Sequence, residues 1–420
     1  MRQNLIAIDK KILAVNLNLN SGLDIINRVW DKKNFFSINL DQSVDIVDLI
    51  IDLSKQMMVK LVLEPEWEAK FEISSYGYRP GKSTKDIIKL ISDYLKNYPS
   101  YVTIINLLNN LLEVNNSFLL HRIDSIPIIQ LNLENWLQLG ILKEYYSYAQ
   151  TFELPKIDLN CISILSPLLI NIIFYDIHSY LQLNPLLLKN IFLIRYSHII
   201  LIMNYKKTLV VQAIKDIKSY ITYLSNSTHN ILIEIYHTTN GFDFLGYNIR
   251  TLFYYDSNNQ QISKCIITPC IQSIKLYIQG NRELIQNFKS NSIEQLIKKL
   301  SSRLIKWGIY YNTCDSQLTF KNMDRVLFSQ IKSLIARRHS NKSRDWLKKK
   351  YFPDNYNYYI FNNVYNSSWV LTSLDTDSSY KVFLPRMQWI PQCNYIAVSP
   401  NKSPYDGDYI YWRKRRKSSL

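Results

Sequence analysis

The 420-residue sequence contains few glycines, prolines and cysteines, and each shortage disfavours a class of protein. Only 9 Gly and 13 Pro occur, which makes collagen-like chains, propellers and glycine-rich nucleotide cradles poor fits. The five cysteines include no CxxC pair, and the two nearest, Cys265 and Cys270, are five residues apart. This odd, scattered set speaks against a disulfide framework or a structural zinc site, and it favours a reducing compartment.

Long apolar runs are also missing. The longest, residues 162–175, has about 14 residues and ends before Asp176, whereas a membrane-spanning helix needs roughly 20. We therefore expect a buried core helix there, and no membrane among the partners. The first 20 residues lack the apolar core of a signal peptide and show no clear transit-peptide pattern.

Acidic residues are outnumbered, and the excess positive charge is concentrated in the C-terminal part. The chain has 50 Lys and Arg against 34 Asp and Glu, a net charge of +16. Residues 271–350 hold 17 Lys and Arg and 5 Asp and Glu, a net of +12, and the last ten residues add +5. With the aromatic residues between them, these charges predict nucleic-acid binding. An anionic membrane surface and simple solubility are the alternative explanations.

The N-terminal half mixes helical and strand patterns. Apolar residues at helical spacing predict a helix over 44–63 that ends close to the segment 64–71. A loop containing glycine and proline follows at 77–81, and Ser83 or Thr84 can cap the next helix.

Two strand patterns come later in this half. Residues 162–210 predict an apolar helix followed by strand–turn–strand over 191–203. Residues 231–256 predict a β-hairpin that turns at Asn240–Gly241. The fold class up to about residue 256 is therefore α+β.

Beyond residue 290 the pattern becomes helical and basic. One apolar face consists of Ile293, Leu296, Ile297, Leu300 and Leu304, and a second of Met323, Leu327, Ile331, Leu334 and Ile335. Ser292 and Gln295 have the spacing of a capping box. Lysines and arginines occupy the opposite side, which predicts a basic helical bundle.

The segment YGYRPGKST contains the GK[ST] ending of a phosphate-binding loop. Gly77 precedes Gly81 by four residues instead of the required five, and no buried strand leads into it. The longer segment EPEWEAKFEISSYGYRPGKSTKDII instead resembles the fingers signature of group II intron reverse transcriptases and maturases. The matching positions are Glu64, Pro65, Trp67, Glu68, Phe71, Ser75, Tyr76, Gly77, Arg79, Pro80, Gly81, Ser83 and Asp86.

The resemblance continues in the order of that family. GFDFLGYNIR at 241–250 resembles its hairpin before the thumb, and ARRHSNKSRDWLKKKYF at 336–352 resembles its helical thumb, or maturase domain. SPYDGDYIYW at 403–412 is similar to the segment after that domain. The resemblance implies the following division: a divergent N-terminal segment (1–43), a degenerate right-hand, reverse-transcriptase-like fingers and palm domain (44–256), a basic helical thumb or maturase domain (271–352), and a C-terminal extension with a basic tail (353–420).

The carboxylates that the family uses for polymerisation are missing. Its first palm Asp aligns with Asn106, and its Tyr-Ala-Asp-Asp turn with Tyr196, Ser197, His198 and Ile199. The Pro-Gln-Gly-Gly segment becomes residues 160–163, and spacing gives no support to Asp158, Asp176 or Asp243 as substitutes. Because two-metal catalysis needs such carboxylates, we expect no polymerase activity and no protein-bound metal. The chain also lacks the family's His-Asn-His nuclease pattern, so DNA cleavage is not expected.

The retained parts imply binding of RNA. Cations neutralise phosphates, and aromatic rings stack on bases. Trp307, Tyr310, Tyr311 and Trp346 are candidates for stacking, with core packing as the alternative, and the tail 413–417 is expected to be a flexible electrostatic arm. The predicted RNA-binding residues are Arg79, Lys82, Lys298, Lys299, Arg303, Lys306, Tyr310, Tyr311, Arg337, Arg338, His339, Lys342, Arg344, Trp346, Lys348, Lys349, Lys350, Arg413, Lys414, Arg415 and Arg416.

The resemblance therefore implies a non-enzymatic splicing cofactor that binds group II intron RNA or its pre-mRNA, with the Mg²⁺ ions held by the RNA and no small-molecule substrate. The alternatives are a general organellar RNA chaperone, a reverse transcriptase with residual activity, and a decaying reading frame. A composition typical of A+T-rich codons favours synthesis within an organelle, a plastid before a mitochondrion. The sequence leaves the oligomeric state and the identity of the intron open.

Overall fold

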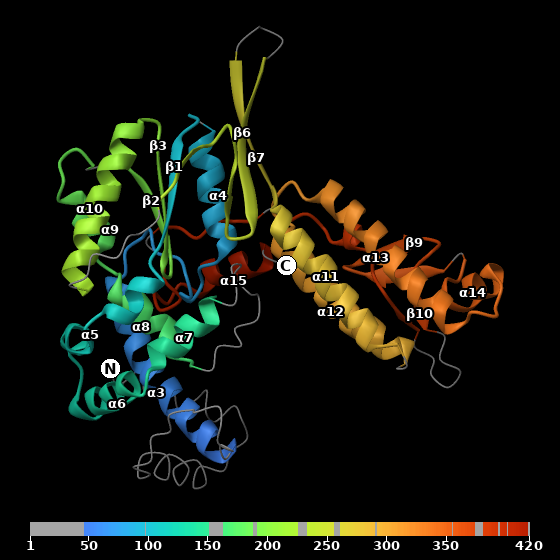
Figure 1. Cartoon of the computed structure of the whole chain (residues 1–420), viewed down its shortest axis with the longest axis horizontal. Coiled ribbons are helices and arrows are strands. Elements are labelled where there is room, and N and C mark those ends of the chain that lie inside the picture. The colour runs from blue at the N-terminus through green and yellow to red at the C-terminus, as the bar shows by residue number, and fades with distance from the viewer. Residues whose placement is uncertain are drawn as a thin grey trace.

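The structure is a computed structural model that describes residues 46–96, 98–150, 163–187, 191–225, 233–255, 261–289, 292–354, 356–373, 381–393, 395–400 and 402–418. The expected N-terminal segment 1–43 lies outside the described residues. A mixed half of sheet and helices, with β1–β4 at its centre, adjoins an elongated helical half around α11–α14 (Figure 1). The expected α+β class is confirmed. Within the described ranges, no helix is long and apolar enough to cross a membrane.

A four-stranded antiparallel sheet organises the first half. Its strand order is β2-β3-β1-β4, formed by β1 (Tyr101–Asn106), β2 (Phe192–Tyr196), β3 (Ile199–Asn204) and β4 (Ile235–His237). The predicted strand–turn–strand over 191–203 is thus confirmed.

Both faces of this sheet are covered, which explains the apolar run Ile199–Met203 in β3. Side chains of successive strand residues point to opposite faces. In β3, Leu201 and Met203 join one apolar core, whereas Ile200 and Ile202 join the other. The first core contains α4 (Thr84–Leu95), and the second contains α8 (Ser166–Ile173) and α10 (Lys207–Ser225). A strand buried on both sides needs apolar residues at every position.

The first described helix is longer than its sequence predicts. α3 runs from Ile46 to Lys70, through Pro65, instead of ending near residue 64. A proline inside a helix costs about 3 kcal/mol. The cost is offset because Val59, Leu63 and Trp67, spaced by four, continue one buried stripe, and Trp67 packs edge-on against Tyr175 at 5.2 Å.

The predicted hairpin turn at Asn240–Gly241 is wrong. β4 pairs with β1 in the main sheet, and this turn leads the chain into a separate three-stranded sheet. The true hairpin joins β5 (Phe242–Phe244) to β6 (Tyr247–Tyr255) across Leu245–Gly246. Both turn residues have positive φ, 49° and 82°, as a two-residue hairpin loop of the primed type requires. β7 (Gln261–Pro269) pairs with β6.

The second half is helical, as its apolar periodicity predicts. It consists of α11 (Ile271–Asn287), α12 (Ile293–Tyr311), α13 (Gln317–Arg338) and α14 (Arg344–Tyr351). Leu296, Ile297, Leu300 and Leu304 are buried, and so are all five predicted apolar residues of α13. Ser292 caps α12, since its Oγ accepts a hydrogen bond from the Gln295 amide at 3.2 Å.

Short elements complete the two halves. In the first half they are η1 (Asn109–Glu113), α5 (Asn116–Ile123), α6 (Pro127–Gln138), α7 (Ile141–Gln150) and α9 (Ile177–Gln182). After α14 they are β8 (Asn357–Ile360), β9 (Asn363–Asn366), β10 (Thr372–Ser373), β11 (Val382–Phe383), η2 (Met387–Trp389) and α15 (Tyr409–Ser418). The last helix, α15, returns to the first half and lies near α4 (Figure 1).

A buried ion pair fixes the loop between α3 and α4. Arg79 donates to both carboxylate oxygens of Glu68, Nε to Oε1 at 2.9 Å and Nη2 to Oε2 at 2.8 Å. Arg79 Nη1 also donates to the carbonyls of Glu72 and Ser75. The two charged side chains are only 5% and 2% exposed, so neither charge has water as an alternative partner.

Replacing Arg79 should therefore destabilise the fold strongly. We expect Arg79→Met to lower the free energy of unfolding by about 3–5 kcal/mol, because it leaves the Glu68 carboxylate buried and unpaired. Urea unfolding followed by circular dichroism measures the loss. The matched control is Lys70→Met, whose partner Glu66 is 53% exposed and whose loss should stay below about 1 kcal/mol. Equal losses of unfolding free energy in the two variants would contradict the stabilising role of the buried Arg79–Glu68 pair.

Candidate nucleic-acid interface

The positions expected to correspond to the lost catalytic carboxylates lie together. Asn106, the last residue of β1, pairs in register with Ile199, directly after the β2–β3 turn. The Leu107 amide donates to the His198 carbonyl at 2.8 Å. The amide oxygen of Asn106 accepts a hydrogen bond from the Leu108 backbone at 2.9 Å and so shapes the local turn.

His198 is partly buried in the turn between β2 and β3. Its Nδ1 lies 3.2 Å from the Tyr145 hydroxyl, which is also 3.3 Å from Ser197 Oγ. Burial lowers the pKa of His198 to about 4, so its imidazole is neutral at pH 7. These contacts give His198 a structural role in the turn.

The other candidate carboxylates have structural partners. Asp176 pairs with Arg122 at 2.9 Å and accepts from the Tyr220 hydroxyl at 2.6 Å, and Asp243 accepts from Asn248 at 2.6 Å. Asp158 and residues 160–162 lie outside the described residues. In the part of the chain that the structure describes, no group of three or more His, Cys, Asp and Glu could hold a metal ion.

The glycine loop packs directly on this turn. A Cβ atom on Gly77 would lie 2.3 Å from the Ser197 nitrogen, which leaves room only for glycine. The Tyr76 amide donates to the Arg195 carbonyl at 2.8 Å, and the Arg195 amide to the Ser74 carbonyl at 2.9 Å. The loop is thus a fixed continuation of the sheet edge.

The structure contradicts the expected role of Arg79 and changes that of Lys82. Arg79 is buried against Glu68 and cannot reach a phosphate. Lys82 is half-buried, and its Nζ donates to the Ser75 carbonyl at 3.0 Å. Burial, and secondarily the charge of Arg79, lowers the pKa of Lys82 to about 7.

Trp307 and Tyr311 of α12 are core residues and Tyr310 packs against the same core, which favours the core-packing alternative over base stacking. Trp307 and Tyr311 are buried, and their rings are 4.4 Å apart. The Tyr310 hydroxyl donates to the Leu245 carbonyl at 2.8 Å, and the Tyr311 hydroxyl to the Gly246 carbonyl at 3.1 Å. Helical spacing places Trp307 and Tyr311 on the face of Leu304, and the hydroxyls of Tyr310 and Tyr311 reach the hairpin turn.

The basic side of α12 remains accessible. Lys298, Lys299 and Lys306 are exposed, whereas Arg303 is half-buried, with its guanidinium 5.8 Å from the Tyr277 ring. Lys298 forms an ion pair with Glu294 at 2.5 Å. The predicted set on this helix therefore divides into three exposed lysines and one packed arginine.

The end of α13 divides in the same way. Arg337 is exposed, but Arg338 turns inward, where its Nε donates to the Lys289 carbonyl at 2.9 Å and its Nη2 to that of Phe288. The His339 Nε2 lies 2.6 Å from the Tyr351 hydroxyl. Partial burial and the nearby cations lower the pKa of His339. Arg338 thus secures the end of α11.

A cationic cluster surrounds Trp346 on α14. Ser343 caps the helix, since its Oγ accepts from the Trp346 amide at 3.3 Å. The Nζ atoms of Lys350 and Lys342 lie 4.8 and 5.5 Å from the half-buried Trp346 ring. Arg344 and Lys349 are exposed nearby, while Lys348 pairs with Asp354 at 2.9 Å. Trp346 is thus a predicted aromatic residue that is partly exposed and surrounded by positive charge.

The tail is a helix and not a flexible arm within the described residues. Arg415 is 8% exposed, and its Nη2 donates to both oxygens of Asp86 at 2.8 Å. Asp86 also accepts from the Val398 amide at 2.7 Å and the Tyr395 hydroxyl at 3.0 Å. Arg413, Lys414 and Arg416 are exposed on the same helix. The sequence contained both motifs but gave no sign that Asp86 and Arg415 pair.

The burial of His198 makes stability depend on pH in a defined window. An unfolded-state pKa near 6.5 and a folded-state pKa of about 4 mean that the unfolded chain binds the proton first. Stability therefore falls as the pH falls from 6.5 to 4, by at most about 3 kcal/mol from this group. We expect His198→Gln to flatten the urea-midpoint profile there. His121→Gln, at an exposed position on α5, should retain the wild-type profile; identical profiles for both variants would contradict the interpretation.

Comparison with known proteins adds one finding to this geometry. No curated protein matches the chain in sequence. Residues 274–352, which cover most of α11 and all of α12–α14, match the family model described as "Group II intron, maturase-specific domain". This match connects the basic helical half of the chain with the maturases and with the splicing of group II introns.

Proposed function

We propose that this protein is a maturase-like splicing cofactor that binds group II intron RNA, helps it to fold and does not polymerise nucleotides itself. The observation that carries the proposal is the maturase-domain match on helices whose outer sides expose lysine and arginine. We further propose that it acts inside an organelle, a plastid before a mitochondrion.

The exposed side chains supply what a folding RNA needs. Compaction of a large RNA brings phosphates together, and lysines and arginines that neutralise them release condensed counterions. Trp346, whose ring lies near the Nζ atoms of Lys342 and Lys350, offers a surface for stacking of an unpaired base, worth on the order of 1–3 kcal/mol. Backbone contacts would position the protein, and base contacts would add selectivity.

The degenerate palm supports a binding role over catalysis. Two-metal phosphoryl transfer needs carboxylates next to the primer end, whereas the corresponding positions hold Asn106, Ser197 and His198. Each of these side chains has a structural hydrogen bond. On this proposal, the intron RNA carries out the transesterifications with Mg²⁺ ions that it binds itself.

RNA binding should depend on the exposed cations of α12–α14. We expect the combined variant Lys299→Gln, Arg337→Gln, Arg344→Gln and Lys349→Gln to bind a group II intron transcript at least roughly tenfold more weakly in 0.1 M salt. The slope of log affinity against log salt should fall by about 3, since each lost phosphate contact removes roughly 0.7–0.9. Filter binding over a salt series measures both quantities.

The matched control removes the same charge elsewhere. Lys206, Lys207, Lys215 and Lys218 are exposed around α10, which lies at the opposite end of the molecule from α14 (Figure 1). Their replacement by Gln should leave the affinity within about twofold and the slope nearly unchanged. Equal losses of affinity for both sets of substitutions would mean that RNA binding depends only on the net charge of the protein.

Primer extension tests the proposed absence of polymerase activity. With an RNA template, a DNA primer, Mg²⁺ and deoxynucleotides, we expect no extension above background, because the described residues offer no cluster of carboxylates that could hold two metal ions. A reverse transcriptase of known activity serves as the positive control. Extension that persists after the protein has been repurified to remove contaminating polymerases would identify the chain as an active enzyme instead.

Crosslinking in its own cells distinguishes a splicing cofactor from a general chaperone. Ultraviolet crosslinking and sequencing of the recovered RNA should enrich one or a few group II introns, with crosslinked peptides from 290–350. Diffuse recovery of unrelated transcripts would favour the chaperone alternative.

A further inference from the structure

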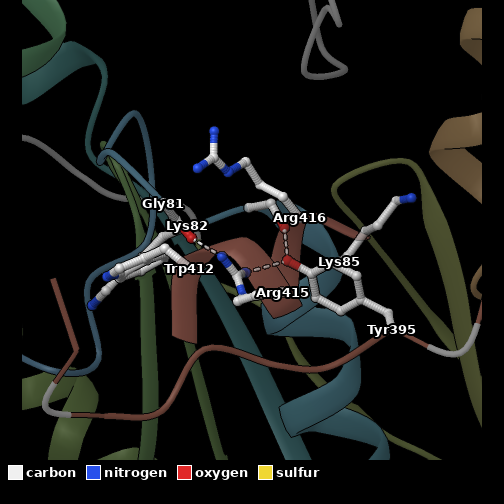
Figure 2. A pocket seen from close by; sticks show the side chains of 8 residues that line it. Gly81, Lys82, Lys85, Tyr395, Trp412, Arg415 and Arg416 are labelled. Atoms are coloured by element: carbon white, nitrogen blue, oxygen red, sulfur yellow. Dashed lines mark hydrogen bonds between the residues drawn. The ribbon is translucent and has the colours of Figure 1, made fainter. Parts of the chain in front are cut away.

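A cationic pocket lies where the glycine loop meets the C-terminal helix. It has a volume of about 280 Å³. Figure 2 shows Arg415 at its centre, with Lys82 and Trp412 on one side and Tyr395 and Lys85 on the other. Half of the eight residues that line it are basic, namely Lys82, Lys85, Arg415 and Arg416, and none of these described residues is acidic.

The wall of the pocket is rigid because it is built from buried, paired groups. Asp86, 0% exposed, holds Arg415 through both of its oxygens. Arg415 also donates to the Gly81 carbonyl and to the Tyr395 hydroxyl. Its guanidinium carbon lies 5.3 Å from the Tyr395 ring and 5.6 Å from the Trp412 ring. The arginine thus sits between two aromatic rings in one orientation.

The glycine loop completes this wall. Gly81 has φ +74°, and a Cβ on it would lie 2.7 Å from the Trp412 ring. The Trp412 Nε1 donates to the Ser403 carbonyl at 3.1 Å and to Asp406 Oδ1 at 3.2 Å. Both contacts hold the indole in place, so the pocket exists before any ligand arrives.

The lining of the pocket is basic. Asp86 pairs with Arg415, and the side chains of Lys82, Lys85 and Arg416 line the same cavity. Lys82 and Lys85 donate to neutral oxygens, the Ser75 carbonyl at 3.0 Å and the Asn312 side chain at 3.0 Å. Burial lowers the pKa of both amines, which an anion between them would reverse.

We propose that this pocket binds a phosphate group, and that in the RNA-bound protein a backbone phosphate of single-stranded RNA occupies it. Charge-assisted hydrogen bonds from lysine and arginine suit phosphate oxygens, and a rim containing Tyr395 and Trp412 suits the attached nucleoside. The RNA source rests on the proposed function. The pocket, built by the 81–85 segment and α15, would be a second RNA-contact region in addition to the helical surface of α12–α14.

The experiment uses the full chain and three probes: a fluorescent 12-nucleotide single-stranded RNA, the mononucleotide UMP, and a group II intron transcript. The pocket variant is Lys85→Gln with Arg416→Gln. The matched control is Lys89→Gln with Lys96→Gln, which removes the same charge at exposed positions on α4 and directly after it, outside the pocket. Thermal unfolding confirms that both variants are folded.

We expect the pocket variant to bind the 12-nucleotide RNA at least roughly tenfold more weakly and the control within about twofold. A 4-thiouridine version of the RNA should crosslink to peptides containing Tyr395 or Trp412. Equally weakened RNA binding in both variants, or crosslinks confined to other peptides, would contradict the proposed phosphate site. UMP binding as tight as that of the RNA would retain the phosphate site but overturn RNA as its source.

The intron transcript separates this inference from the proposed function. If the transcript binds selectively and the pocket variant behaves like its control with both RNAs, the pocket is refuted while the proposed function stands. If short RNA binding depends on the pocket but the protein does not prefer a group II intron over unrelated structured RNA, the pocket stands and the proposed function fails.

Discussion

The bond between Asp86 and Arg415 is the constraint on which the architecture depends. Asp86 lies in the first turn of α4, and Arg415 lies 329 residues later in α15. A buried carboxylate is tolerated only when its lone pairs are occupied, and here the partners are Arg415, Tyr395, Ser83 and the Val398 amide. One charge therefore fixes the glycine loop, the segment around Tyr395 and the last helix relative to one another.

The same principle organises the rest of the first half. Arg79 and Glu68 fasten the loop to α3, and Gly77 lets its backbone touch the β2–β3 turn. The sheet beneath is covered on both faces, so the central strand β3 is apolar over most of its length. The second half is attached through Tyr310 and Tyr311, whose hydroxyls bond to the Leu245–Gly246 turn. The exposed lysines of α12 are consequently presented from a rigid base.

Local patterns predicted much of this fold and less of the interface. The periodicity of Leu296 to Leu304 and of Met323 to Ile335 identified two helices and their buried faces, because packing of an amphipathic helix is a local property. The Asn240–Gly241 signal identified a real turn but the wrong partner strand, since strand pairing is decided by contacts far apart in sequence. Pro65 misled in the same way, because the stripe ending in Trp67 outweighs the local preference.

Positive charge was a poorer guide than apolar spacing to what a side chain does. Arg79, Arg338 and Arg415 carry the same charge as Arg337, yet all three are used to satisfy oxygens within the protein. Arginine suits both tasks because its planar fork matches carboxylates, carbonyls and phosphates alike. Only burial separates the two groups, and burial depends on a distant partner such as Glu68 or Asp86 that no sequence window contains.

The distance along the chain between Asp86 and Arg415 has a consequence for synthesis. A ribosome adding about 5–20 residues per second needs on the order of 15–60 s to make the 329 residues that separate them. During that interval α4 and the glycine loop exist without the cation that neutralises Asp86, and the carboxylate must stay hydrated. The glycine loop can reach its final form only once the last helix has emerged. A motif that is synthesised early is therefore completed late.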